Sequence, residues 1–449
     1  MDMVRPIFHL RTKENWINDP NGPVFIKGQF HMFMQHNPKA PVWGNMTWAH
    51  AVSPDMVNWQ RLPHAMYPDK PYDKDGVFSG CCVMHNGIPH ILYTGVYPET
   101  LCLAIGDEDG MNFTKYEHNP ILTRGDRDLK HGWRDPYIWT EDGKYRMIIG
   151  SGAGGEGNAF AEIYEGTDLL NWSEPVKVTD ASEYSLTDTM WECPIVVRNG
   201  EDAVLIVSSP FPKGKFLLRA ISGKLRNGKL ENGVLGLADL GDSAYAPNLV
   251  QHPDGRWILF AWEIEGGDPE KRAVQGWQGM LTLPREVAVE NGSLVVRPAK
   301  EVDSLREKNL FHEENMNDAD VTVESGQHYE ADIKLSPNGG TAVLELLKES
   351  EGNGVQVVFD GENIDVIHGK YAGGEEKKLS GKVVPEKECH LRIFVDGTSI
   401  EIYINDREVL TTRAYPNPDC TRFGIKTTEN CKINLLDLYA VKNCYSSEI

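Results

Sequence analysis

The chain alternates short apolar runs with polar turns, and one such unit recurs five times. Each unit has a polar or small residue at its start, an apolar run, a turn and a second apolar run. The units start at Asp19, Ser79, Asp135, Glu192 and Ala246, and they turn at Lys27-Gly28, Asn86-Gly87, Asp142-Gly143, Asn199-Gly200 and Asp254-Gly255. Asn-Gly and Asp-Gly between apolar runs are typical of tight hairpins, because both turn residues must tolerate a positive φ. The pattern predicts five β-hairpins.

The starts of the five units lie about 55 to 60 residues apart, which suits the blades of a β-propeller with loops. A second recurring motif supports the repeat. It combines a polar turn with an aromatic residue, and it occurs at Ser53–Trp59, Asp107–Phe113 and Gly166–Trp172. Long helical periodicity is absent. We therefore expect an all-β chain in which residues 1–302 form a five-bladed antiparallel propeller.

The pattern changes after the charged stretch Lys300–Lys308. Short runs with period-two alternation follow, and they include 343–347, 355–359, 391–396 and 399–405. Such alternation is typical of strands that face a core on one side and water on the other. Residues 303–449 are therefore predicted to be a linker and a C-terminal β-sandwich.

Composition narrows the class of partner. The chain has 45 Lys and Arg against 66 Asp and Glu, a formal charge of −21, which repels nucleic acids and anionic membranes. It contains neither an apolar export signal nor a run of about 18 apolar residues. Eight cysteines show no CxxC pair and no zinc-ligand spacing. We expect a cytoplasmic protein with free thiols, no metal, no cofactor and a neutral small-molecule partner.

Three of the five units start with an acid, namely Asp19, Asp135 and Glu192. A single acid beside a proline is usually a turn residue. The innermost strands of a propeller converge on its axis, so three acids at one position of the repeat are expected to meet. Glycoside hydrolysis needs two such carboxyl groups, one that attacks or stabilises the sugar carbon and one that protonates the leaving oxygen.

Neighbouring residues predict different roles for the acids. Glu192 follows Trp191, and an apolar neighbour would raise its pKa as a general acid requires. Asp135 follows Arg134, whose charge would keep that carboxyl ionised. Cys193 has no identifiable His partner, so we interpret it as a small buried residue that tunes the adjacent acid.

Sugar sites also use aromatic surfaces and polar donors. Candidates near the starts of the units or in tight loops are Gln35, Trp43, Trp48, Phe78, Ser79, Tyr245 and Trp262.

These residues fall in motifs that resemble glycoside hydrolase family 32, the family of invertases, sucrose-6-phosphate hydrolases, inulinases, levanases and fructosyltransferases. The motifs are Trp16–Gly22, Phe78–Gly80, Trp133–Pro136 and Trp191–Pro194, together with Trp43–Trp48, Asp242–Pro247 and Trp277–Arg285. They occur in order along nearly the whole chain.

The resemblance implies a five-bladed propeller followed by a β-sandwich, and a retaining β-fructofuranosidase that acts on sucrose or fructo-oligosaccharides without a cofactor. It implies that Asp19 is the nucleophile, Glu192 the acid/base, and Asp135 a stabiliser that grips fructose hydroxyls together with Arg134. Asn18, Gln35, Trp43, Trp48, Phe78 and Ser79 would complete the fructose pocket.

Two alternatives remain open at this point. A fructosyltransferase would use the same carboxylates and would pass fructose to a sugar instead of water. A non-catalytic fructan-binding propeller would keep the aromatic surface and lose an acid. Because all three acids are present, the non-catalytic alternative is disfavoured. Hydrolysis is favoured over transfer because water needs no specially built acceptor site; the sequence leaves the preferred substrate and the oligomeric state open.

Overall fold

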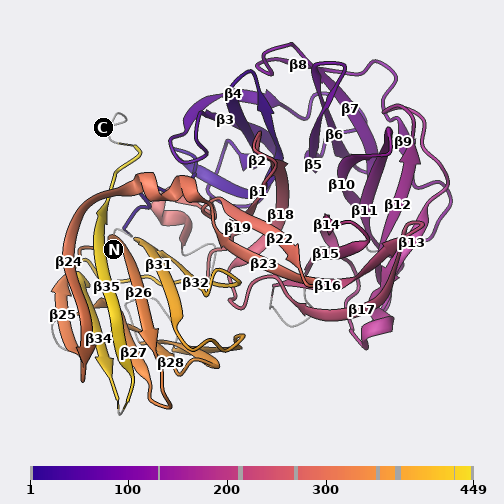
Figure 1. The fold of residues 1–449 in the computed structure, drawn as a ribbon. Coiled ribbons are helices and arrows are strands. Elements are labelled where there is room, and N and C mark those ends of the chain that lie inside the picture. Colours follow the sequence, from indigo (N-terminus) through magenta and orange to yellow (C-terminus); the bar gives the residue numbers. More distant parts are fainter. Residues whose placement is uncertain are drawn as a thin grey trace.

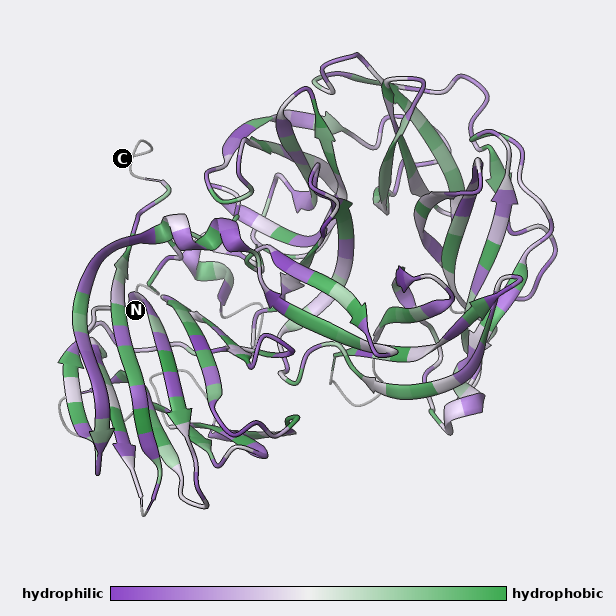
Figure 2. Ribbon diagram, viewed as in Figure 1, coloured by the Kyte–Doolittle hydropathy of each residue, from purple (hydrophilic) through white to green (hydrophobic). Residues whose placement is uncertain are grey.

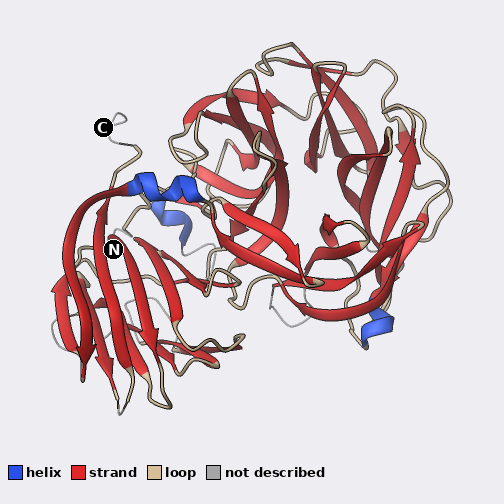
Figure 3. Ribbon diagram, viewed as in Figure 1, coloured by secondary structure: helices blue, strands red, loops and turns tan. Residues whose placement is uncertain are grey.

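The computed structural model describes residues 4–129, 132–210, 216–266, 272–349, 354–369, 376–428 and 430–445. Strands dominate (Figure 3), and the short helices are η1 (Ala181–Tyr184), η2 (Ala273–Gln275) and η3 (Lys300–Leu305). Within these ranges, no helix is long and apolar enough to cross a membrane. The prediction of an all-β chain is confirmed.

Five antiparallel sheets form a ring (Figure 1). The first contains β1 (Asn15–Ile26), β2 (Gln29–Asn37), β3 (Thr47–Ser53), β4 (Gln60–Met66) and, in parallel with β1, β20 (Trp277–Gln278). The second contains β5 (Gly76–His85), β6 (Ile88–Val96), β7 (Thr100–Gly106), β8 (Phe113–Lys115) and β9 (Leu122–Thr123). The third contains β10 (Gly132–Glu141), β11 (Lys144–Gly152), β12 (Ala159–Gly166) and β13 (Val176–Asp180).

The fourth sheet contains β14 (Glu192–Asn199), β15 (Asp202–Ser209), β16 (Leu217–Arg226) and β17 (Lys229–Leu237). The fifth contains β18 (Ala244–Gln251), β19 (Trp257–Glu263), β21 (Met280–Leu281), β22 (Arg285–Glu290) and β23 (Ser293–Pro298). The first strand of each sheet contacts the first strands of both neighbouring sheets, so β1, β5, β10, β14 and β18 close into an inner ring. This is the predicted five-bladed propeller.

All five predicted hairpins are present. Three of them turn on two residues that both have positive φ, such as Asp142 at 50° and Gly143 at 73° between β10 and β11. This backbone conformation matches the twist of paired strands, and Asn, Asp and Gly adopt it at the lowest steric cost. The turn chemistry of the sequence therefore fixes where each inner strand ends.

Each inner strand also carries a β-bulge near its start. In β10, Arg134 pairs with Gly150 and Tyr137 pairs with Ile148, so two residues of β10 face a single residue of β11. Equivalent shifts occur in β1, β5, β14 and β18. A bulge bends a strand and re-aims its side chains, and all five inner strands have their bulge at the same position of the repeat.

Two six-stranded sheets form the C-terminal part of the chain (Figure 1). One contains β24 (Arg306–Asn317), β35 (Lys432–Val441), β26 (His328–Ser336), β31 (Cys389–Asp396), β32 (Ser399–Ile404) and β33 (Glu408–Arg413). The other contains β25 (Asp320–Glu324), β34 (Arg422–Thr427), β27 (Ala342–Lys348), β28 (Val355–Phe359), β29 (Asn363–His368) and β30 (Lys377–Lys382). Hydrophobic and hydrophilic residues alternate along these strands (Figure 2), and the apolar side chains share one core. The predicted β-sandwich is confirmed.

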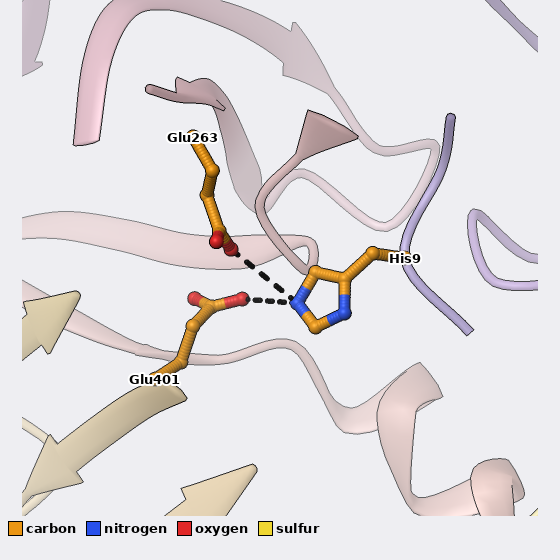
Figure 4. A group of neighbouring side chains, drawn as sticks. All are labelled: His9, Glu263 and Glu401. Carbon is orange, nitrogen blue, oxygen red and sulfur yellow. Dashed lines mark hydrogen bonds and ion pairs between the residues drawn. The ribbon is translucent and has the colours of Figure 1, made fainter. Parts of the chain in front are cut away.

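A buried ion cluster joins the N-terminal segment and the propeller to the sandwich (Figure 4). His9 Nδ1 lies 2.8 Å from Asp396 Oδ2, and His9 Nε2 lies 2.9 Å from Glu401 Oε1 and 3.5 Å from Glu263 Oε1. Burial alone would lower the pKa of His9, but the hydrogen bonds to Asp396 and Glu401 and the nearby carboxylates raise it to about 10. Arg285 of the propeller also donates to Glu401 Oε2, at 2.6 Å. His9 is therefore an imidazolium held between the two parts.

We predict that His9→Gln destabilises the protein by about 3–5 kcal/mol at neutral pH, because it removes a buried cation that contacts three buried carboxylates, those of Asp396, Glu401 and Glu263. The His9 contribution is fully present below the pKa of about 6.5 in the unfolded chain, and it is lost as the pH rises through about 10. The gap in unfolding free energy between wild type and variant should therefore narrow between pH 6.5 and 10. Chemical denaturation across this range measures the gap.

His118→Gln is the matched control, because the His118 side chain is mostly exposed and its ion contact is with the exposed Glu117. A gap for His9→Gln that stays constant from pH 6.5 to 10 would contradict the assigned charge.

Candidate active site

Side chains from the five bulges surround the propeller axis. In each inner strand, one bulge residue directly precedes a proline or a glycine. These residues are Asp19, Ser79, Asp135, Cys193 and Ala246, which precede Pro20, Gly80, Pro136, Pro194 and Pro247 in that order. Asp135, Cys193 and Ala246 have φ values of 65°, 45° and 50°, a conformation that L-residues seldom adopt and that clusters at functional sites. The predicted meeting of residues from distant units is observed, but the prediction that the three acids share one position of the repeat is wrong for Glu192: Cys193 occupies that position, and Glu192 lies one residue before it.

Asp19 is held by three side chains. Its Oδ2 accepts from Ser79 Oγ at 2.5 Å and from Cys193 Sγ at 3.6 Å, and its Oδ1 accepts from Asn18 Nδ2 at 2.9 Å. Burial raises the pKa of Asp19, and the charge of Glu192 adds to the effect, while the bonds from Ser79 and Asn18 oppose it. The site thus holds a desolvated carboxyl group in a fixed orientation.

Asp135 lies across Cys193 from Asp19. Its Oδ2 accepts from the backbone N–H of Cys193 at 3.0 Å and from Cys193 Sγ at 3.5 Å. The prediction that Arg134 keeps Asp135 ionised is wrong: Arg134 Nε lies 4.0 Å away, and burial outweighs its charge, so the pKa of Asp135 is raised. Cys193 therefore contacts both aspartates, rather than only tuning the adjacent glutamate.

Glu192 is bound by one cation and one phenol. Its Oε1 accepts from Arg134 Nη2 at 2.6 Å and Nε at 3.1 Å, and its Oε2 accepts from Tyr245 at 2.5 Å. Burial and the charge of Glu192 raise the pKa of Tyr245 well above its ordinary value, so the phenol keeps its proton and donates. Trp191 lies instead in the core, where its Nε1 donates to Asp188, so the environment of Glu192 is more polar than predicted.

Glu99 is a member of the site that sequence reasoning missed. Its Oε1 accepts from Arg134 Nη1 at 2.6 Å and its Oε2 from the backbone N–H of Trp133 at 2.8 Å. Glu99 lies on the connection between β6 and β7, outside the repeated start of the unit. Only the packing of the second blade against the third reveals it.

Aromatic side chains line two sides of the site. Trp43, which is 58% exposed, lies edge-on to Phe78 with ring centroids 6.0 Å apart. Trp262 packs against Trp16 and Tyr245, at 5.5 and 6.3 Å, and its Nε1 has no hydrogen-bond partner within the described ranges. Phe78, Trp43 and Trp262 therefore remain candidates for substrate contact.

Two predicted contact residues lie behind the site. Trp48 is 0% exposed, and its Nε1 donates to the Phe78 carbonyl at 3.2 Å. We correct its role from substrate contact to support of Phe78. Gln35 is buried between the first two blades, where its Nε2 donates to the Val77 carbonyl; its contact with substrate stays a prediction.

The axis is nearly closed below the bulges. The space lined by the prolines and Asn248 holds only about 10 Å³, and Asn248 Nδ2 donates to the carbonyls of Pro20 and Gly80. A cavity of about 590 Å³ lies further along the inner strands, lined by residues such as Phe25, Trp139 and Trp257, and none of the three acids faces it. The acids therefore lie at one end of the propeller axis, and the nearly closed space at the prolines separates them from the cavity.

Groups that could ligate a metal lie elsewhere. His9, Glu263 and Glu401 have ligand atoms within 4.8 Å of one another. The raised pKa of His9 keeps a proton on its ring nitrogens, and a protonated nitrogen cannot coordinate a cation. We interpret this group as the ion cluster that joins the two parts of the chain.

Comparison with known proteins gives matches over nearly the whole chain. Residues 9–298 match the model of the glycosyl hydrolases family 32 N-terminal domain, and residues 301–440 match the family 32 C-terminal model. A raffinose invertase of Escherichia coli is 33% identical over 94% of this chain and 91% of its own length. A sucrose-6-phosphate hydrolase of Escherichia coli is 32% identical over 92% of this chain and 90% of its own length.

Solved structures share the fold. A family 32 β-fructofuranosidase of Bombyx mori aligns with a TM-score of 0.82 and 26% identity, over 98% of this chain and 94% of that one. A fructan 1-exohydrolase of Cichorium intybus, 21% identical, supports the fold alone, with a TM-score of 0.85 over 98% of both chains.

Proposed function

Because the chain belongs to family 32 of the glycosyl hydrolases, we propose that it is a retaining β-fructofuranosidase that releases terminal fructose from sucrose or fructo-oligosaccharides. Its relatives include proteins named raffinose invertase and sucrose-6-phosphate hydrolase. The formal charge of −21 suits a neutral sugar better than a polyanion.

The single observation that carries the proposal is the meeting of Asp19, Asp135 and Glu192 around one axis. Cys193 Sγ lies within 3.6 Å of the first two, and Arg134 lies within 4.0 Å of the last two. A retaining glycosidase needs a nucleophilic carboxylate and an acid/base on either side of the scissile bond. The site supplies both, with a third carboxyl group beside them.

In the first step, Asp19 attacks the anomeric carbon of fructose while Glu192 donates its proton to the leaving oxygen. Burial removes water from Asp19, and Ser79 and Asn18 fix its oxygens for in-line attack. In the second step, the ionised Glu192 takes a proton from water, which attacks the fructosyl ester and frees Asp19. Arg134 and Tyr245 stabilise the ionised Glu192 between the two steps.

Asp135 would act as the stabiliser of the sugar. Its carboxyl group is held by the Cys193 backbone, and its own backbone N–H donates to Thr94 Oγ1 at 3.0 Å. The raised pKa lets this carboxyl group donate as well as accept hydrogen bonds to fructose hydroxyls.

We also propose that the enzyme works in the cytoplasm. All eight cysteines are free thiols, including the buried Cys193. Free thiols persist in a reducing compartment.

Replacement of the two reacting carboxyl groups tests the function. Glu192→Gln should lower kcat for fructose release from sucrose by about 10²–10⁴-fold, because general acid catalysis is lost. Asp19→Asn should lower it at least as far, because no fructosyl ester can form. Asp109→Asn, an exposed aspartate paired with Lys27, is the control. Wild-type rates in either active-site variant would refute the proposed function.

The pH profile tests the role of Ser79. Asp19 must be ionised to attack, and the Ser79 hydrogen bond lowers its pKa. Ser79→Ala should therefore raise the pKa of Asp19 further and move the acid limb of kcat/KM to higher pH. Ser208→Ala removes a buried hydroxyl that accepts from the Ala246 backbone instead, so its acid limb should stay in place. An unmoved limb in Ser79→Ala would contradict the assignment.

A further inference from the structure

Glu99 reaches the site from outside the inner ring. It is buried, and each of its two oxygens binds one group of the next blade: Arg134 Nη1 at 2.6 Å and the Trp133 N–H at 2.8 Å. The acid is therefore oriented at both oxygens, and its charge faces Arg134.

The other edge of the same guanidinium faces Glu192. Arg134 Nη2 and Nε both donate to Glu192 Oε1. One cation thus bridges an acid of the second blade and an acid of the fourth. Since the guanidinium is planar and rigid, fixing one edge fixes the direction of the other.

The backbone makes room for this bridge at Gly132. A Cβ on Gly132 would lie 2.1 Å from Arg134 Nη1 and 3.1 Å from Glu99 Oε1, and the residue has a φ of 131°. Both features require glycine here. The strand start is therefore shaped around the contact between Glu99 and Arg134.

Charges around the bridge are unbalanced. Asp135, Glu192 and Glu99 share Arg134. Burial would lower the pKa of Arg134, but the charges of these three acids raise it well above its ordinary value. Arg134 places its fixed positive charge directly against Oε1 of Glu192. A general acid needs the protonated form, so an unopposed arginine would work against the first step.

We propose that Glu99 is a positioning residue that acts through Arg134 on Glu192 and sets the alkaline limit of the enzyme's activity. Its negative charge offsets part of the arginine's field, and its two hydrogen bonds aim the guanidinium at Oε1 only, which leaves Oε2 to Tyr245. The proposal rests on the assignment of Glu192 as acid/base. The other groups that face Glu192 are Asp19, Asp135 and the Cys193 thiol.

The test is the pH dependence of kcat/KM for sucrose in Glu99→Gln, which removes the charge and retains an acceptor for Arg134. The positive charge of Arg134 beside the general acid is then less opposed. The alkaline limb should move down by about one pH unit, an estimate for a charge several ångströms away at an effective dielectric constant near 20.

Two variants serve as controls. Glu99→Asp keeps the charge with a shorter reach, so its alkaline limb should stay near that of wild type while kcat falls. Glu141→Gln removes a carboxylate that pairs with Arg198 on the wall of the far cavity, and it should leave both limbs unmoved. Should Glu99→Gln fail to fold, Glu99→Ser, which admits water beside Arg134, is measured in the same way.

An alkaline limb that stays in place when the charge of Glu99 is removed would overturn the proposal, as would equal shifts in the Gln and Asp variants. A purely structural role would lower the melting temperature and leave the limb unmoved. Failure of the proposed function gives a different result, because Glu192→Gln would then retain activity.

Discussion

The arrangement of side chains at the catalytic end of this molecule depends on one backbone feature, a β-bulge that adds a single extra residue near the start of each inner strand. The bulge turns the residue before the proline or glycine toward the axis, and in Asp135, Cys193 and Ala246 it holds φ near 50–65°. Such a conformation costs about 1–2 kcal/mol per residue relative to ordinary backbone. The surrounding blades impose this positive φ at those three residues, and the five bulges together give a ring of side chains that no single blade could assemble.

The same arrangement gathers more negative charge than the site can hold ionised. Burial raises the pKa of both Asp19 and Asp135, and Arg134 is the cation that contacts Glu192 and Glu99. Among the described residues of the site, Arg134 supplies the fixed positive charge that Glu192, Asp135 and Glu99 share. The position of that positive charge, and not the identity of the acids alone, distinguishes the chemical roles of the acids.

The sequence was informative where structure is local and repeated. Asp142-Gly143 marks a hairpin because its backbone conformation is intrinsic to those residue types. The acids at 19, 135 and 192 stand out because each lies at the position before the proline of its unit or one residue from it. Glu99 could not be found in this way, since it acts from a connection between strands and meets Arg134 only through packing between blades. Trp48 and Trp43 carry the same side chain, yet one supports Phe78 from the core and the other lies at the surface; burial is set by the neighbouring blades.

The closure of the ring has a consequence for how the chain matures on the ribosome. β1, which carries Asp19, pairs along its free edge with β20, and the segment before it is bound through His9 to Asp396 and Glu401. β1 can pair with β2 at once, but its other partner strand, β20, and the partners of His9 lie more than half a chain-length later. Until they arrive, the nascent first blade exposes an unpaired strand edge, and a truncated product would keep that edge open.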